Sequence, residues 1–321
     1  MGNGRNSRTG VILLSMGGPN RPEDIPSFLY NIFSDRTLIR LPGGALFQKP
    51  LAKLISHLRS KKVEANYRLI GGGSPLLKWT RSQADHIQTL AAEEGLDISC
   101  YIGMRYFHPL IPETIEDAVG DGCRRLIFLP LYPQYSAATT GSSFEAARKA
   151  LRRHEDIEAV YIRDFHDNSA YIQFLAARIE ENIRPDETLL FSAHALPQRF
   201  VDDGDPYVDQ VRKCTMLAAG DREHYLAFQS RTGPVKWVGP DTVDEVRRLL
   251  EEGRKLFIVP ISFVCDHIET LFEIDIDLPE RMKRLGIEPR IRRMPMFNDD
   301  TRFSRVLLDV IRKDVPVHVP L

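Results

Sequence analysis

The sequence is poor in cysteine and has no long apolar run. Its four cysteines are dispersed among 321 residues without a C-x-x-C pair, which argues against an all-cysteine metal cluster and fits a reducing compartment. No apolar run approaches the ~20 residues that cross a bilayer, and residues 1–10 lack the apolar core of a signal peptide. From these absences we expect a cytoplasmic protein.

The sequence also lacks an excess of charge of either sign. The 43 Lys and Arg residues balance 44 Asp and Glu residues, so the composition gives no argument for a nucleic-acid partner, and we expect none. The glycine-rich stretch 71–73 is followed by no Lys-Ser or Lys-Thr pair, and no G-x-G-x-x-G follows a predicted strand. These absences disfavour a nucleotide-binding enzyme.

What the sequence does contain is a series of short apolar runs with helical stretches between them. The runs lack clean alternation of polar and apolar residues, which is typical of strands buried on both faces of a parallel sheet. The predicted strands are Gly10–Met16, Ile98–Met104, Leu126–Tyr132, Ala159–Arg163, Thr188–Ala193, Tyr225–Gln229, Lys255–Ile261 and Arg290–Met294. After the first interval their spacing suits βα units.

Eight strands divide naturally into two halves. We therefore predict an α/β protein of two similar doubly wound domains, each with a four-stranded parallel sheet and with the active-site cleft between them. The predicted domains are residues 1–165 and 166–321, with a boundary near residues 163–168. The last helix, predicted over Thr301–Lys313, could cross back onto the first half.

An insertion of about eighty residues follows the first strand, too long for a single crossover. It contains a predicted helix at Asp24–Phe33 and a second over Leu46–Lys62. In the second helix an apolar stripe and a basic surface occur together, namely Leu51, Leu54, Ile55 and Leu58 with Lys49, Lys53, Arg59, Lys61 and Lys62. Two interpretations stay open: a helix packed on its own domain, or one that covers an apolar ligand or rests on an anionic membrane.

Polar residues follow the predicted strand ends, where doubly wound folds bind their ligands. His194 comes directly after the apolar strand Thr188–Ala193 and shortly before Pro197, so we expect it to face the cleft. A histidine titrates near neutrality, which suits it to accept a proton or to bind a metal. The alternative is a structural histidine that is hydrogen-bonded within a loop.

Carboxylates follow the seventh predicted strand at helical spacing. If this segment is helical, one face presents the four residues Asp266, Glu269, Glu273 and Asp277. Imidazole combined with carboxylate is a reasonable ligand set for a divalent first-row metal such as Fe(II). A solvated acidic helix face is the alternative.

Several motifs along the chain give it a resemblance to a known family. It resembles ferrochelatases, the enzymes that insert ferrous iron into a porphyrin, over almost its whole length. The motifs that carry the resemblance are Gly71–Pro75, Tyr101–Tyr106, Leu131–Ser136, Phe191–Pro197, Gly204–Tyr207, Gln229–Arg231 and Asp266–Leu271. So many ordered matches are very unlikely to arise by chance.

The resemblance implies a set of site residues in a porphyrin cleft between two similar α/β domains. It implies that His194 is the catalytic histidine and Glu269 the metal-site glutamate, and we expect both to take part in catalysis and in the metal site. From the carboxylate stripe we add the hypothesis that Glu273, Asp277 and Asp266 form a relay for cations or protons. Met16, Arg105 and Tyr106 match the opposite wall of the family's porphyrin pocket. Tyr135, after a strand end, and Ser74, after the glycine run, complete the predicted porphyrin-binding set.

The resemblance also bears on the substrate, on cofactors and on the membrane. Residues 41–67 match a lip over the pocket mouth, which touches the bilayer in membrane-associated members. Some members hold a [2Fe–2S] cluster through a cysteine at the position of Ala137, so we expect no cluster and no other prosthetic group here. Iron enters as substrate, Fe(II). We expect protoporphyrin IX as the porphyrin, with coproporphyrin III or a non-catalytic tetrapyrrole-binding protein as alternatives.

Overall fold

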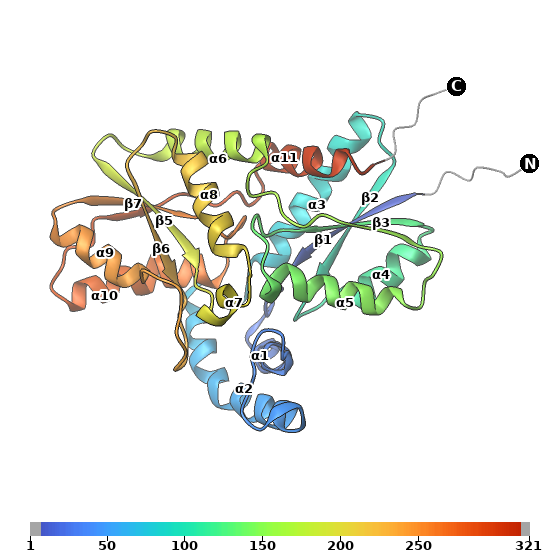
Figure 1. Ribbon diagram of the computed structural model, residues 1–321, viewed down its shortest axis with the longest axis horizontal. Helices are drawn as coiled ribbons and strands as arrows, with labels where there is room; N and C mark the ends of the chain where they lie inside the picture. Colours follow the sequence, from blue (N-terminus) through green and yellow to red (C-terminus); the bar gives the residue numbers. More distant parts are fainter. Residues whose placement is uncertain (1–7, 316–321) are drawn as a thin grey trace, which may run out of the picture.

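Eight parallel strands form two four-stranded sheets, one in each half of the chain (Figure 1). The computed structural model describes residues 8–315. The strands of the first sheet are β1 (Thr9–Ser15), β2 (Ile98–Met104), β3 (Arg125–Pro130) and β4 (Glu158–Tyr161). Those of the second are β5 (Glu187–His194), β6 (His224–Gln229), β7 (Lys255–Pro260) and β8 (Ile291–Arg293).

The two sheets repeat one topology. Their orders are β2-β1-β3-β4 and β6-β5-β7-β8, which are identical once the second half is renumbered. In each sheet the chain reverses its direction of winding at one point, between β1 and β3 or between β5 and β7, where doubly wound folds place their ligands. The predicted fold class is therefore confirmed, with all eight strands close to their predicted positions.

The strands are apolar without alternation because both faces of each sheet are covered. On β1, Val11 and Leu13 belong to the central core, whereas Ile12 and Leu14 pack on the opposite face of the sheet. Alternate side chains of a strand point to opposite faces, so a strand buried on both faces needs apolar residues at every position. The central core continues from the first sheet into the second.

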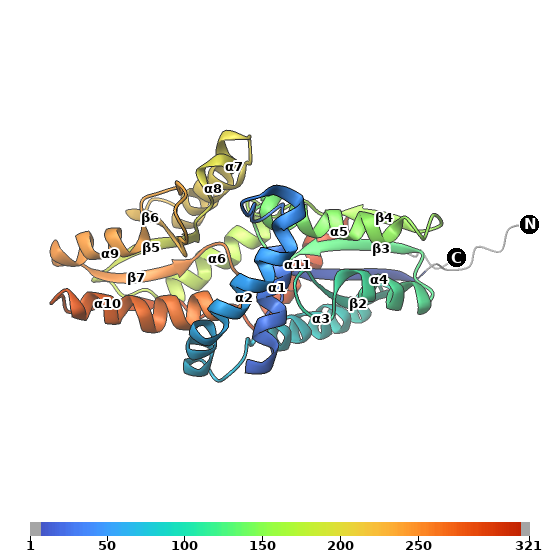
Figure 2. The ribbon, with the colours of Figure 1, turned by 90° about the horizontal axis from the view of Figure 1, so that it is seen from below.

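Helices form layers around the sheets (Figure 2). The central core is completed by α3 (Leu76–Glu93), α6 (Ser169–Asn182), α8 (Tyr207–Ala219) and α11 (Thr301–Arg312). The outer faces are covered by α4 (Ile111–Gly120) and α5 (Ser142–Leu151) on the first sheet, and by α9 (Thr242–Glu251) and α10 (Leu278–Arg284) on the second. The helix α7 (Gln198–Asp202) is short and lies between β5 and α8.

The last helix joins the two halves of the chain. Along α11, Arg305 and Arg312 form ion pairs with Glu94, which ends α3 of the first half. The same helix buries Phe303 against Phe174 of α6 in the second half. The predicted domain boundary near residues 163–168 falls between β4 and α6 and stays a prediction.

The insertion forms a helical projection that extends away from the two sheets (Figure 1). After the short 3₁₀ turn η1 (Pro22–Asp24) it consists of α1 (Ile25–Ser34) and α2 (Gly44–Leu69), and α2 is longer than predicted. The buried face of α2 is not the predicted leucine stripe, since Leu54 and Leu58 are exposed. It consists of Gln48, Ala52, Ser56 and Tyr67. The Gln48 amide donates to the carbonyl oxygen of Phe33, within α1, and to that of Ile39, after it. No helix in the described part of the chain has the length and apolar character to span a membrane.

Serine hydroxyls precede two helix starts in the first half of the chain. The helix α3 begins at Leu76, whose N–H donates to the Ser74 hydroxyl at 3.3 Å. The Ser136 hydroxyl accepts from the Ala138 N–H and caps a π-helical segment, η2 (Ala137–Gly141), that leads into α5. Each hydroxyl satisfies one of the free N–H groups at the start of a helix.

Candidate active site

His194 is the last residue of β5, which lies between β6 and β7 in the second sheet. Its main chain is held on both sides: its N–H donates to Ser262 Oγ at 3.2 Å, and its carbonyl oxygen accepts from the Tyr207 hydroxyl at 2.9 Å. The Tyr207 and Ser262 hydroxyls are themselves 2.6 Å apart. The position of the imidazole is therefore set by a central strand and by a buried tyrosine from α8.

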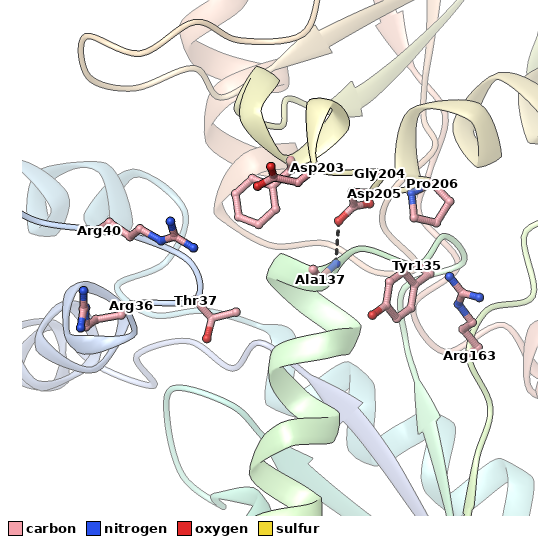
Figure 3. A pocket seen from close by; sticks show the side chains of 11 residues that line it. Arg36, Thr37, Arg40, Tyr135, Ala137, Arg163, Asp203, Gly204, Asp205 and Pro206 are labelled. Atoms are coloured by element: carbon pink, nitrogen blue, oxygen red, sulfur yellow. Dashed lines mark hydrogen bonds between the residues drawn. The ribbon is translucent and has the colours of Figure 1, made fainter. Parts of the chain in front are cut away.

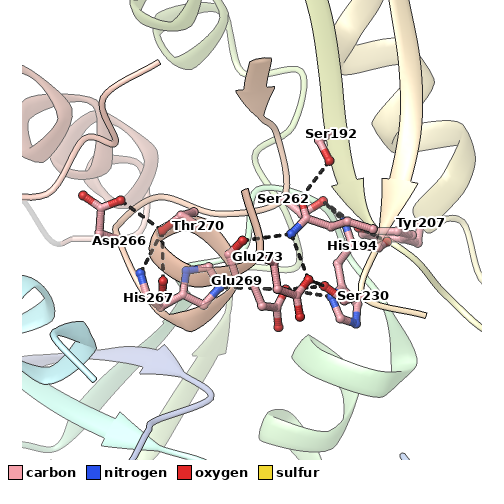
Figure 4. A network of polar contacts seen from close by, with 11 residues as sticks. Ser192, His194, Tyr207, Ser230, Ser262, Asp266, His267, Glu269, Thr270 and Glu273 are labelled. Atoms are coloured by element: carbon pink, nitrogen blue, oxygen red, sulfur yellow. Dashed lines mark hydrogen bonds and ion pairs between the residues drawn. The ribbon is translucent and has the colours of Figure 1, made fainter. Parts of the chain in front are cut away.

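His194 and Glu269 form a hydrogen-bonded ion pair (Figure 4). The distance from His194 Nδ1 to Glu269 Oε2 is 2.8 Å, and 39% of the histidine side chain but only 16% of the glutamate side chain is exposed. Glu269 begins the π-helical segment η3 (Glu269–Asp277), which follows β7. Because Nδ1 is engaged, Nε2 is the ring nitrogen that remains for a ligand.

A second glutamate lies behind this pair. The Ser230 hydroxyl donates to Glu273 and also lies 3.4 Å from Glu269 Oε2. The Gln229 amide donates to the Glu269 carbonyl oxygen at 3.1 Å and is 3.4 Å from Glu273 Oε2. Both residues come from the end of β6, and Ser230 has a positive φ of 66°, which directs its hydroxyl to the carboxylates. Two strand ends and one π-helical segment thus converge on one polar cluster.

The three titratable groups of this cluster differ in their pKa values. Burial lowers the pKa of His194, but the Glu269 carboxylate outweighs it and raises the pKa above the usual value of histidine. Burial opposes ionisation of Glu269, yet the His194 charge holds the pKa of Glu269 well below the usual range. For Glu273, burial and the neighbouring Glu269 charge raise the pKa to about 7. At neutral pH the cluster therefore holds the ionised Glu269 carboxylate beside two groups, His194 and Glu273, whose pKa values are raised by its charge.

A second histidine faces the same carboxylate. His267 Nε2 lies 3.9 Å from Glu269 Oε2, and its ring packs against Phe263 with 4.3 Å between the ring centres. Burial lowers the pKa of His267, so this ring is neutral near pH 7. Its other nitrogen, Nδ1, is buried without a hydrogen-bond partner in the part of the chain that the structure describes.

The predicted carboxylate stripe is only partly brought together. Glu269 and Glu273 share the cluster with His194, as described above. Asp266 instead forms an ion pair with Arg293 at 3.0 Å and accepts from the Asn298 amide at 2.8 Å. Asp277 pairs with Arg281 at 2.6 Å at the far end of η3. Relay roles for Asp266 and Asp277 stay predictions, and both carboxylates are neutralised by arginine.

Arg105 and Tyr106 share one carboxylate that the sequence analysis did not single out. Asp35 Oδ2, at the end of α1, accepts from the Arg105 guanidinium (2.6 Å), the Tyr106 hydroxyl (2.9 Å) and the Ser142 hydroxyl (2.8 Å). The Asp35 side chain is 7% exposed, and although burial raises its pKa, the Arg105 charge lowers it overall. This carboxylate joins α1 to the end of β2 and to α5. Nothing in the pattern around Asp35 distinguishes it from an ordinary helix end.

Three buried tyrosines whose pKa values respond to Glu269 were not among the predicted site residues. They are Tyr67 of α2, Tyr132 after β3 and Tyr207 of α8. Burial is the largest cause that raises the pKa of each phenol, and the negative charge of Glu269 adds to it. All three therefore remain neutral hydroxyls. Tyr132 and Tyr207 lie within the motifs Leu131–Ser136 and Gly204–Tyr207, whereas no motif marks Tyr67.

The remaining predicted porphyrin-binding residues occupy different places. Met16 is half-buried and packs on the cluster at the base of the projection, next to Tyr106. Ser74 lies against Gly18. A Cβ atom added at position 18 would be only 2.6 Å from the Cβ atom of Ser74, so only glycine fits there. Tyr135 lies under the Arg163 guanidinium, 4.4 Å from it, and lines two hollows to which His194 does not contribute. The structure thus brings Met16 and Tyr106 together and places Tyr135 apart.

Solved structures of similar fold are chelatases. The sirohydrochlorin chelatase SirB from Bacillus subtilis subspecies spizizenii in complex with cobalt gives a TM-score of 0.55 at 11% identity, covering 96% of this chain and 95% of that one. CbiX, the terminal enzyme of sirohaem biosynthesis in denitrifying bacteria, gives a TM-score of 0.51 at 12% identity, covering 96% and 100%. At such low identity these likenesses bear on the fold alone.

Sequence comparison goes further than the fold. Residues 8–315 match the family model described as Ferrochelatase. The chain is 43% identical to the ferrochelatase of Cyanothece sp. over 95% of its own length and 83% of the relative's. It is 41% identical to that of Gloeobacter violaceus over 97% and 99% of the two lengths. With this identity over nearly the whole of both chains, the protein belongs to the ferrochelatase family.

Proposed function

We propose that this ferrochelatase inserts Fe(II) into protoporphyrin IX, with His194, Glu269 and Glu273 as the groups that handle the displaced protons. The observation that carries the proposal is the 2.8 Å contact between His194 Nδ1 and Glu269 Oε2 at the carboxyl end of β5. The pair lies near the winding reversal of the second sheet, where ligands of this fold class bind.

Metallation replaces both inner pyrrole protons of the porphyrin with one metal ion. Glu269 raises the pKa of His194, so His194 Nε2 is a stronger base than a free imidazole. A histidine nitrogen that holds a proton cannot bind a metal. Because the raised pKa of His194 favours the proton at Nε2, we assign His194 to proton removal and not to metal binding. Glu273, with a pKa raised to about 7 by burial and by Glu269, is the natural acceptor for the next proton. Ser230 and Gln229 hold that carboxylate next to the pair.

Fe(II) must lose bound water and find ligands before it enters the ring. The Glu269 carboxylate, kept ionised by His194, is an oxygen ligand for the arriving ion, and the neutral His267 ring lies 3.9 Å from it. The position that bears a cluster cysteine in some members is Ala137, which offers no thiolate. We therefore propose iron as substrate and assign no resident cofactor.

We base the choice between porphyrins on the residues predicted to form the wall opposite His194. Met16 and Tyr106 lie in an apolar cluster, and the Arg105 guanidinium is already paired with Asp35. Such a wall suits protoporphyrin IX better than coproporphyrin III, which has more carboxylates to satisfy. Steady-state Fe(II) insertion with each porphyrin tests this choice, and a higher kcat/KM for coproporphyrin III would reverse it.

The test of the catalytic assignment is His194→Ala. We expect metal insertion to fall by about 10²–10⁴-fold, the usual contribution of a positioned base, while porphyrin binding, followed by fluorescence quenching, stays within a few fold. The matched control is His154→Ala, which removes a histidine that pairs with Glu116 at 3.0 Å away from the cluster. Full activity in His194→Ala would overturn the assignment. Porphyrin binding without metal uptake in the wild type would favour a tetrapyrrole-binding protein instead.

We also propose that the projection touches an anionic membrane surface. On α2, Leu46 is 81% and Leu58 is 69% exposed, and the same helix carries Lys49, Lys53, Lys61 and Lys62. When vesicles of anionic lipid are sedimented, the wild type should be found with the vesicles, whereas the variant Leu46→Glu/Leu58→Glu should stay in the supernatant. The control Leu285→Glu changes an equally apolar, 53% exposed residue after α10 and should bind like the wild type. Equal sedimentation of all three proteins would contradict this proposal.

A further inference from the structure

Two adjoining hollows lie beside Tyr135, and neither is lined by His194 or Glu269. The first has a volume of about 640 Å³ and lies between the loop after α1 and the loop between α7 and α8 (Figure 3). The second, of about 650 Å³, shares Thr37, Tyr135, Ala137 and Arg163 with the first and continues along α5. Because four residues are common to both, the two hollows form one continuous recess.

Four arginines line this recess, and none of them forms an ion pair with a carboxylate in the part of the chain that the structure describes. Arg36 and Arg40 come from the loop after α1, Arg148 comes from α5, and Arg163 follows β4. We call these four residues the arginine recess. Some other arginines, such as Arg105 and Arg302, are paired at 2.6 Å and 2.7 Å. The recess differs from the rest of the described surface in that four arginines without a carboxylate partner line one hollow.

Two of these arginines lie over aromatic rings. The guanidinium carbon of Arg163 is 4.4 Å from the centre of the Tyr135 ring, and that of Arg148 is 4.8 Å from the centre of the Tyr161 ring. A guanidinium group attracted to a ring face keeps its N–H donors available for a bidentate pair with a carboxylate or a phosphate. In Figure 3, Arg163 stands beside Tyr135 while Arg36 and Arg40 lie on the other side of the recess.

Three carboxylates, Asp203, Asp205 and Glu145, also line the recess, one fewer than its arginines. Asp205 accepts from the Ser136 hydroxyl, the Ala137 N–H and the Tyr207 N–H, whereas Asp203 and Glu145 are exposed. A further cation, Arg199, donates to the Leu38 carbonyl oxygen at 3.1 Å. Burial, and then the charge of Arg40, lowers the pKa of Arg199, although the Asp203 charge acts in the opposite direction.

We propose that the arginine recess binds a small organic polyanion that carries phosphate or carboxylate groups. Guanidinium groups from three separate segments meet there, and such groups recognise both anions through paired hydrogen bonds. The recess is large enough for a molecule of metabolite size, and its aromatic walls suit a ligand with a flat or apolar part. The site is distinct from the His194 cluster, and its occupation does not require iron insertion.

Calorimetric titration of the full-length protein with pyrophosphate and with citrate tests the proposal. We expect saturable binding of at least one of these probes, and the tighter one identifies phosphate or carboxylate as the preferred group. In the variant Arg36→Ala/Arg163→Ala the affinity should fall at least tenfold. The control Arg81→Ala/Arg290→Ala removes two exposed arginines outside the recess and should bind like the wild type.

Three results would overturn the proposal. They are the absence of binding to the wild type, binding that is unchanged in Arg36→Ala/Arg163→Ala, and an equal loss in the control pair, which would indicate non-specific attraction. A higher KM for porphyrin in Arg36→Ala/Arg163→Ala, with anion binding unaltered, would assign the recess to the porphyrin carboxylates and also overturn it. Thermal unfolding of each variant checks that the fold is intact.

Discussion

The sharpest perturbation of the active-site cluster is Glu269→Gln. The substitution keeps the shape of the side chain and one oxygen that can accept from His194 Nδ1, but it removes the negative charge. Because that charge is what raises the pKa of His194 against the effect of burial, the pKa of His194 should fall in the variant. The imidazole then becomes a weaker base for a pyrrole proton.

The magnitude follows from the contact itself. A hydrogen bond to a charged group contributes about 1.5–3 kcal/mol. Since 39% of the His194 side chain is exposed, solvent screens the pair and the lower part of that range applies. A loss of about 1.5–2 kcal/mol from the transition state corresponds to a decrease of about 10–30-fold in kcat.

Two measurements check this prediction. Metal insertion followed over a range of pH gives kcat, and NMR titration of the histidine rings gives the pKa of His194. Glu116→Gln is the matched control, because Glu116 also contacts a histidine, His154, at 3.0 Å but lies far from the cluster. If the pKa of His194 were unchanged in Glu269→Gln, or if kcat fell without any change in that pKa, the electrostatic account of the pair would be wrong.

Two further predictions concern Glu273. Its pKa is raised to about 7, so the folded protein retains a proton that the unfolded chain loses near pH 4.5, and stability falls between those pH values as pH rises. In urea unfolding at pH 8, the free energy of unfolding of Glu273→Gln should therefore exceed that of the wild type by about 1–2 kcal/mol. At pH 4 the two proteins should be equally stable, and an equal effect of the substitution at both pH values would contradict this prediction. The Ser230 hydroxyl lowers the pKa of Glu273, so in Ser230→Ala the acidic limb of the metal-insertion profile should move to higher pH, whereas an unmoved limb would exclude Ser230 from the proton path.

Much of the fold was predictable because it depends on patterns within short segments. Apolar residues on both faces of β1 or β5 can be buried only in a sheet covered on both sides, so their positions and the parallel class follow from local composition. The regular spacing of the strands implies the helices between them. The structure corrected details where one side chain decides the outcome: Gln48 holds α2 against Phe33 of α1 and against Ile39 after it, and Leu54 and Leu58 are exposed.

For the active site, the sequence indicates which groups end the strands, and His194 was recognisable for that reason. The partners of these groups were not predictable: Ser230 contacts Glu273, Arg105 is paired with Asp35, and Asp266 is neutralised by Arg293. A pKa or an ion pair depends on atoms within a few ångströms, and folding brings these atoms together from segments that are tens of residues apart in the sequence. Local patterns predict a strand end, whereas the partners of its side chain are a property of the packed molecule.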